Sequence, residues 1–273
     1  MSIAIVTGGA SGIGRAIAAA LVARGDSVTL ADLNGAGAEQ AAAELSARGP
    51  GTAVAAKLDV TDAGAVAELY QSVKSEAGRL DLVFNNAGIA IGGLAEELTL
   101  DHWNRAIDVN LKGVIHGVHA AYPIMLEQGY GHIVNTASLA GLVPMPMGIP
   151  YTATKHAVVG LSLGLRAEAA GRRVKVSVIC PGFVDTPLLA NVNADLPATR
   201  MSGDARADIK QTSPRLYTAD KLARDIMRGV RKNQALIVAP ASGRAAWRGM
   251  RLLPGGGIRA AQFAVDRYRG KSS

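Results

Sequence analysis

Cysteine is nearly absent from this sequence: Cys180 is the only one among 273 residues. A single thiol cannot form a disulfide within the chain, which excludes a small secreted scaffold held by disulfides and favours a reducing compartment. No charged segment and cleavage site precede the first apolar run, Ile3–Val6, so we expect no signal peptide and a cytoplasmic location.

Uninterrupted apolar segments of membrane-spanning length are also lacking. The longest uncharged stretch, Ile133–Thr154, contains Asn135, Thr136, Ser138 and three prolines. We interpret it as a buried strand that runs into an irregular loop, because polar and helix-breaking residues are poorly suited to a membrane span.

Acidic residues are scarce at the C-terminus. The chain has a net charge of +7, of which residues 243–273 carry +6, so residues 1–242 are close to neutral. A nucleic-acid-binding function would have to depend on this tail alone, and we expect no nucleic-acid partner.

The tail has a helical pattern of its own. Arg244, Arg248 and Arg251 fall on one helical face, Pro254–Gly257 is expected to break the helix, and a second helix is expected over Ile258–Arg269. Two interpretations stay open: a helix pair that contacts anionic lipid as a peripheral membrane element, or one that packs against the body or a sister subunit. We therefore expect a domain over residues 1–242 and a basic helical extension over 243–273.

Short β-branched runs alternate with longer Ala- and Leu-rich segments of helical period. Such alternation predicts a single α/β domain of the Rossmann type, with a doubly wound parallel β-sheet in a three-layer α/β/α arrangement. The polar segment 188–217 interrupts the pattern and is predicted to be a substrate loop. The expected strands are Ile3–Thr7, Ser27–Ala31, Ala53–Leu58, Leu82–Phe84, His132–Thr136, Lys175–Ile179 and Ala235–Val238, and the expected helices are Ile13–Arg24, Ala36–Arg48, Ala63–Glu76, Leu100–Glu127, Tyr151–Ala170 and Ala219–Lys232.

A glycine-rich turn follows the first strand and opens the first helix. Glycines allow the backbone to approach a pyrophosphate, and the N–H groups at the start of the helix then face the anion. The residues expected to bind the cofactor here are Gly8, Ser11, Gly12, Ile13 and Gly14. Asp32, at the end of the second strand, is placed to accept both ribose hydroxyls and to repel a 2′-phosphate, although a helix cap or turn aspartate is the alternative.

The next strands also end in small or polar residues. Asp59-Val60 follows the third strand, Asn86-Ala87-Gly88 the fourth and Ser138 the fifth. Ligands of open parallel sheets bind outside the carboxyl ends of the strands, so these residues are expected to line one site. Tyr151 and Lys155, four residues apart, share one face of a helix, where the ammonium is expected to favour the phenolate and make Tyr151 a general acid/base.

These motifs, with Asn110 and Pro181-Gly182, follow the order and spacing of the short-chain dehydrogenase/reductase family, and the sequence resembles its short, single-domain branch over residues 1–190 and 219–239. The resemblance implies that Asn110, Ser138, Tyr151 and Lys155 are catalytic, with Asn110 ordering a water that passes protons to Lys155. It also implies cofactor contacts by Asp59 and Val60 at the adenine, by Asn86, Ala87 and Gly88 at the adenosine ribose and phosphates, by Tyr151 and Lys155 at the nicotinamide ribose, and by Pro181, Gly182, Val184 and Thr186 at the carboxamide and pyrophosphate.

The expected activity is oxidation of a secondary alcohol to a ketone, or the reverse, with NAD(H) and without a metal. The carboxylate of Asp32 and the uncharged Ala10 and Ser11 favour NAD over NADP, because like charges at close range repel. An apolar substrate is expected from the loop residues Leu142, Val143 and Met145, and the resemblance implies a homodimer or homotetramer paired through the long helices. An NAD-retaining epimerase or dehydratase, and a nucleotide-sensing protein without catalysis, stay open as alternatives.

Overall fold

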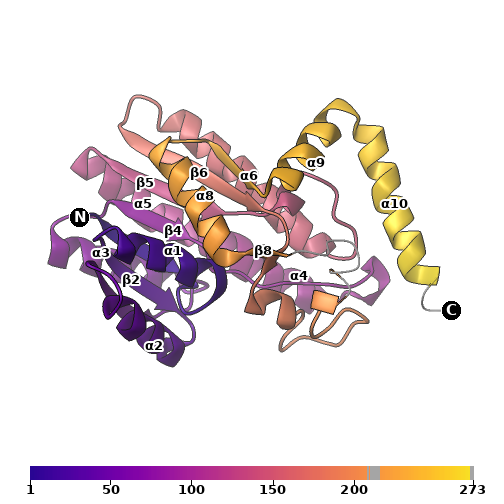
Figure 1. Ribbon diagram of the computed structural model, residues 1–273, viewed down its shortest axis with the longest axis horizontal. Helices are drawn as coiled ribbons and strands as arrows, with labels where there is room; N and C mark the ends of the chain where they lie inside the picture. The colour runs from indigo at the N-terminus through magenta and orange to yellow at the C-terminus, as the bar shows by residue number, and fades with distance from the viewer. Residues whose placement is uncertain (208, 210–215, 271–273) are drawn as a thin grey trace.

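The protein is built around one parallel β-sheet, shown in Figure 1. The computed structural model describes residues 1–207, 209 and 216–270. The predicted substrate loop therefore lies partly outside the described residues, as does Lys271 of the tail. Seven strands in the order β3-β2-β1-β4-β5-β6-β9 pair in parallel throughout. The predicted fold class, a doubly wound Rossmann-type sheet, is confirmed.

Outside the helix expected over Leu100–Glu127 and the tail, the bounds of the predicted elements agree with the structure to within about two residues. The strands are β1 (Ile3–Thr7), β2 (Ser27–Asp32), β3 (Thr52–Lys57), β4 (Leu82–Asn85), β5 (Gly131–Thr136), β6 (Val174–Pro181), β7 (Val184–Asp185), β8 (Tyr217–Thr218) and β9 (Leu236–Ala239). The α-helices are α1 (Gly12–Ala23), α2 (Gly35–Ser46), α3 (Ala63–Ala77), α4 (Leu100–Ile107), α5 (Gly113–Gln128), α6 (Ile149–Glu168), α8 (Ala219–Arg231), α9 (Ala241–Leu252) and α10 (Pro254–Gly270).

Polar caps and left-handed glycines set several helix ends. The side chain of Asp62 accepts a hydrogen bond from the Ala65 N–H at 3.0 Å at the start of α3. Gly25 and Gly78 follow α1 and α3 with φ of +90° and +73°, a region that favours glycine. These local signals are why the helices end where the sequence predicts.

Helices cover both faces of the sheet (Figure 1). One apolar core contains side chains of α1, α2 and α8, including Ile17, Ala41 and Ile226. The other contains side chains of α3 and α5, including Tyr70 and Met125. The strand order reverses between β1 and β4, so the carboxyl ends of these strands form the crevice in which open α/β sheets bind ligands.

The helix expected over Leu100–Glu127 is not continuous. A π-helical turn, Asp108–Lys112, separates α4 from α5 and contains Asn110. Such turns add one residue to the helical circuit and occur frequently at functional sites. Periodicity did not predict the turn, because its flanking apolar residues keep a nearly helical spacing.

The tail also departs from its predicted form. Two helices are present, but α10 starts at Pro254, so Gly255, Gly256 and Gly257 belong to its first turn instead of separating the helices. Proline is well tolerated at the first helical position, where its missing N–H has no intrahelical partner. The break between the helices is the single residue Leu253.

Candidate active site

The glycine-rich turn forms a backbone cradle at the N-terminus of α1. Gly12 has a φ of +53°, and a Cβ on Gly14 would lie only 2.1 Å from the carbonyl oxygen of Gly8. Ser11 is exposed, precedes Gly12 and Ile13 at the start of α1, and makes no side-chain cap hydrogen bond there. These glycines let the backbone turn tightly at the N-terminus of α1, where the N–H groups of the first helical turn suit a pyrophosphate group.

The segment after β6 stands against this turn. A Cβ on Gly12 would lie 3.2 Å from the Cβ of Thr186, which is itself buried, as is Val184. Gly182, which follows Pro181, donates its N–H to the carbonyl oxygen of Ala239 at 2.8 Å and is held beside β9. The two segments predicted to contact the same pyrophosphate are therefore neighbours.

Asp32 lies beside the cradle and is already hydrogen bonded. Its Oδ2 accepts from the Ala10 N–H at 3.0 Å, and its Oδ1 accepts from the Asn34 N–H at 2.9 Å. Asn34 caps α2, so the alternative that Asp32 is a helix cap is wrong. The other alternative, that Asp32 is a turn aspartate, is confirmed by its hydrogen bond from the Asn34 N–H. Each carboxylate oxygen retains a lone pair, so the turn bonds leave room for ribose hydroxyls.

Thr7 fixes the loop after β4 to the end of β1. Its hydroxyl accepts hydrogen bonds from the N–H groups of Asn86 at 2.9 Å and Ala87 at 3.0 Å, and the Asn86 amide donates to the Thr7 carbonyl at 3.0 Å. This organising role of the Thr7 side chain was not predicted from the sequence. The one feature of the sequence that could have indicated this role is the position of Thr7 directly before Gly8 and Gly9.

Asp59 and Val60 lie at the end of β3, as predicted. Hydrogen bonds from Thr61 to the carboxylate of Asp59 hold its pKa below the usual range, although partial burial opposes this. The Val60 carbonyl accepts a hydrogen bond from Nδ1 of His116 at 2.9 Å. His116 therefore serves a structural contact, and the described residues contain no group of three or more His, Cys, Asp or Glu arranged for a metal.

Ser138, Tyr151 and Lys155 come together at the carboxyl end of β5. Ser138 precedes a short 3-10 turn, and Tyr151 lies in the first turn of α6. Burial raises the pKa of the Tyr151 phenol, while its hydrogen bond with Ser138 acts in the opposite direction. Nζ of Lys155 lies 5.5 Å from the centre of the Tyr151 ring, so hydroxyl, phenol and ammonium form one cluster.

The lysine of this cluster is deeply buried. Lys155 is 3% exposed and donates to the Thr136 carbonyl at 3.1 Å. Burial lowers its pKa to about 8. The expectation that the pKa of Tyr151 is lowered is not met, because burial of the phenol has the larger effect.

Asn110 is buried in the π-helical turn and pairs with the loop after β4. Its Oδ1 accepts from the Ile89 N–H at 2.9 Å, and its Nδ2 donates to the Ile89 carbonyl at 3.1 Å. A Cβ on Gly88 would lie 2.9 Å from Asn110 Oδ1 and 3.5 Å from Lys155 Nζ. Gly88 therefore lies between these two groups, and Asn110 fixes the loop that contains it.

The described part of the predicted substrate loop is pinned by Asn193, which the sequence did not single out. Its carboxamide contacts both backbone groups of Gly92 and the hydroxyls of Thr199 and Ser202. Nε2 of His102, at the start of α4, also lies 3.0 Å from the Pro197 carbonyl. The short strands β7 and β8 pair on either side of this loop. Asn193 has a φ of +57°, a left-handed conformation that asparagine tolerates. Because this polar segment contains several Asn and Asp residues, the sequence alone did not distinguish Asn193 from the others.

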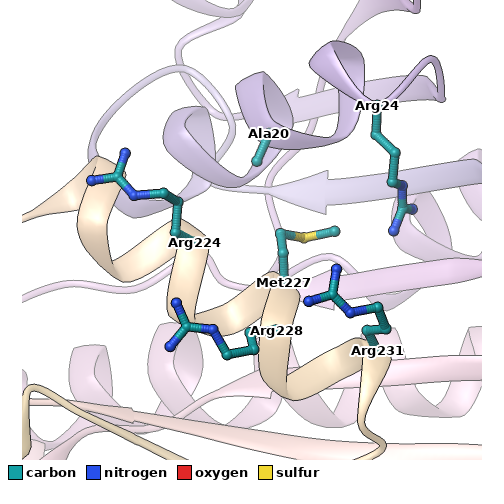
Figure 2. A pocket seen from close by; sticks show the side chains of 6 residues that line it. All are labelled: Ala20, Arg24, Arg224, Met227, Arg228 and Arg231. Carbon is teal, nitrogen blue, oxygen red and sulfur yellow. The ribbon is translucent and has the colours of Figure 1, made fainter.

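A surface hollow of about 290 Å³ lies elsewhere, between α1 and α8. Figure 2 shows Arg24, Arg224, Arg228 and Arg231 around Met227 and Ala20. Arg24 pairs with Asp26 and Arg228 with Asp225. Because Arg24 follows the last residue of α1, about 18 Å along the helix from the glycine-rich turn, this hollow is not part of the site.

Comparison with known proteins agrees with this geometry. Residues 2–197 match the short chain dehydrogenase family. The chain is 36% identical over 235 residues to the probable oxidoreductase EphD of Mycobacterium bovis, covering 85% of this chain and 40% of EphD. It therefore spans less than half the length of that relative.

Two further matches cover most of the length of the matched protein. A cyclohexanol dehydrogenase of Acinetobacter sp. is 38% identical over 190 residues, covering 69% of this chain and 75% of that enzyme. The crystal structure of a short chain dehydrogenase/reductase from Burkholderia phymatum in complex with NAD superposes with a TM-score of 0.83 at 30% identity, covering 93% of this chain and 94% of that one. The chain belongs to the short-chain dehydrogenase/reductase family of oxidoreductases.

Proposed function

We propose that this protein is an NAD(H)-dependent dehydrogenase that interconverts a secondary alcohol and a ketone. The observation that carries the proposal is the cluster of Ser138, Tyr151 and Lys155 at the same sheet edge as the glycine cradle. A dinucleotide lying across the switch point between β1 and β4 would present its nicotinamide to that cluster.

The residues present fit the cofactor. The tight backbone turn formed by Gly8, Gly12 and Gly14 lies at the N-terminus of α1, whose N–H groups suit a pyrophosphate. Asp32 offers a carboxylate to the adenosine ribose, and its negative charge disfavours a 2′-phosphate, which supports NAD over NADP. The NAD in the Burkholderia phymatum structure supports the same choice. When bound, the nicotinamide supplies or accepts the hydride.

In the proposed reaction the side chains of the protein transfer the proton and orient the substrate oxygen. Burial keeps the Tyr151 phenol protonated near neutral pH, so it is ready to donate a proton to a ketone oxygen. The hydroxyl of Ser138 holds the same oxygen, and the ammonium of Lys155 favours the phenolate that forms. We propose that Asn110 orders a water that passes protons to Lys155, with its backbone carbonyl and second Oδ1 lone pair as the candidate acceptors for that water.

We also propose a homodimer or homotetramer in the cytoplasm. An apolar hollow of about 270 Å³ between α5 and α6 is lined by Ile115, Val118, His119, Tyr122, Pro123 and Leu161. This is the face through which the resemblance implies pairing. The buried thiol of Cys180 is compatible with a reducing compartment.

The test is a screen of secondary alcohols of increasing bulk, including cyclohexanol, with NAD as acceptor and NADH formation as the readout. The proposal expects turnover of at least one apolar alcohol, with release of NADH. A nucleotide that co-purifies and is never released would favour the epimerase or dehydratase alternative. NAD binding without turnover of any alcohol or ketone would favour the sensing protein.

A further inference from the structure

The two tail helices are fixed to the body at both ends. In α9, Trp247 packs against the apolar cluster of Val238 and Val158, and Arg244 donates to the Val238 carbonyl at 2.9 Å. At the other end, Nη2 of Arg269 lies 3.2 Å from the carboxylate of Glu96. Packing against the body, one of the two interpretations of the tail, therefore describes the ends of this helix pair.

The end of α10 also contacts the substrate loop. The Arg200 guanidinium carbon lies 5.7 Å from the centre of the Tyr268 ring, and Arg200 pairs with Glu97. The helix pair is therefore held in a defined place relative to the described part of the predicted substrate loop.

The corner between α9 and α10 is exposed, unlike the two ends of the helix pair. Figure 1 shows α9 and α10 meeting at a corner that stands away from the sheet and its covering helices. Leu252 and Leu253 at this corner are 80% and 72% exposed, and Ile258 in the next turn is 48% exposed. Single exposed apolar residues are ordinary, but two consecutive leucines at a projecting corner form an apolar tip.

Charge at the corner is of one sign. The segment Arg248-Gly-Met-Arg-Leu-Leu-Pro-Gly-Gly-Gly-Ile-Arg259 contains three arginines and no acidic residue. The Arg251 guanidinium carbon lies 5.8 Å from the centre of the Trp247 ring, and Arg251 is the residue directly before the two leucines. An apolar tip flanked in the chain by arginines complements a bilayer with anionic headgroups, which offers apolar depth and negative charge together.

We propose that this corner, residues 248–259, is a peripheral membrane contact that inserts Leu252 and Leu253 among the lipids of an anionic bilayer while Arg248, Arg251 and Arg259 bind the headgroups. No helix of the described residues is long and apolar enough to cross a membrane, so the contact is interfacial. The contact between Tyr268 of α10 and Arg200 would then hold the predicted substrate loop at a fixed distance from the bilayer surface. This arrangement suits apolar substrates that partition into lipid.

The experiment is flotation of the full-length protein with two kinds of vesicle: phosphatidylcholine alone, and equal parts of phosphatidylcholine and phosphatidylglycerol. We expect flotation with the anionic vesicles, weaker flotation with the neutral ones, and loss of binding at high salt. Flotation does not require turnover, so its result is independent of the proposed dehydrogenase activity.

Two variants separate the apolar and charged contributions. L252S/L253S removes the apolar tip, and we expect binding to weaken about tenfold or more. R248A/R251A/R259A removes the cations, each of which strengthens binding to an anionic surface about fivefold. The matched controls are L100S, at a leucine that is 76% exposed, and R172A/K175A/K221A, at three exposed cations outside the tail, and both should float like the wild type.

Two results would overturn the proposal. The first is that wild type fails to float with anionic vesicles, or floats no better than L252S/L253S. The second is that L252S/L253S dissociates an oligomer in size-exclusion chromatography with light scattering, which would make the corner a contact between copies of this chain. Circular dichroism of each variant checks that a loss of binding is not a loss of fold.

Discussion

Nζ of Lys155 donates a hydrogen bond to the carbonyl oxygen of Thr136 at 3.1 Å, which ties α6 to the carboxyl end of β5. The same burial that allows this contact lowers the pKa of Lys155 to about 8, from 10.5 in the unfolded chain. The charged lysine is therefore costly to the fold, and under the proposed mechanism this cost supplies the cation beside Tyr151.

The first prediction concerns stability against pH. Below pH 8 both states hold the lysine proton, so the burial penalty of about 3 kcal/mol applies in full. Between pH 8 and 10.5 the unfolded state binds more protons, so the free energy of unfolding contributed by Lys155 rises with pH. Burial raises the pKa of Cys180 to about 12 from 9.0, which lowers stability above pH 9, so the informative window is pH 8–9.

K155M should therefore be more stable than the wild type at pH 7, by up to about 3 kcal/mol, and this advantage should shrink as the pH rises through 8 to 9. Urea titrations across pH 7–9 measure it, with K112M, at an exposed lysine, as the control. Parallel stability profiles for K155M and the wild type would contradict the assigned shift.

A second prediction concerns the substrate loop. Asn193 is 4% exposed and joins Gly92, Thr199 and Ser202 through one carboxamide. N193A leaves several of these buried groups unpaired and should cost about 2–3 kcal/mol of stability. Hydrogen exchange of residues 189–206 should become faster than in N191A, which removes only a bond to the Pro187 carbonyl at the surface. Equal exchange in the two variants would show that Asn193 does not hold the loop.

Cofactor preference gives a third prediction. D32N removes the charge at the ribose and keeps one side-chain oxygen, which can accept one of the two turn hydrogen bonds that the Asp32 carboxylate accepts. The ratio of kcat/KM for NADH over NADPH should fall about tenfold or more, because the repulsion of a 2′-phosphate is lost. D62N, which retains the cap of α3, should leave the ratio unchanged. An unchanged ratio in D32N would mean that another residue sets the preference.

Much of the fold and the placement of the site residues was predictable because both depend on local signals. Alternation of apolar runs, caps such as Asp62 and glycines such as Gly78 fix the elements, and parallel pairing then gathers the strand ends. The π-helical turn at Asn110 was not predictable from periodicity, because it changes the helical circuit by one residue without changing composition.

Effects of burial were also beyond the sequence. The spacing of Tyr151 and Lys155 predicts a shared helical face, and the two groups are indeed neighbours. It does not reveal how deeply the phenol lies, and depth decides the direction in which its pKa moves. The role of Asn193 depends in the same way on contacts between segments about 100 residues apart.

The most direct test is the Y151F variant. The phenyl ring keeps the packing of α6 but lacks the hydroxyl that hydrogen bonds with Ser138 and that we propose as the proton donor. On an alcohol turned over by the wild type, the account predicts unchanged NADH affinity, measured by fluorescence titration, and a fall in kcat of about a hundredfold or more. Turnover close to that of the wild type, with NADH affinity intact, would contradict the assignment of Tyr151 as the acid/base.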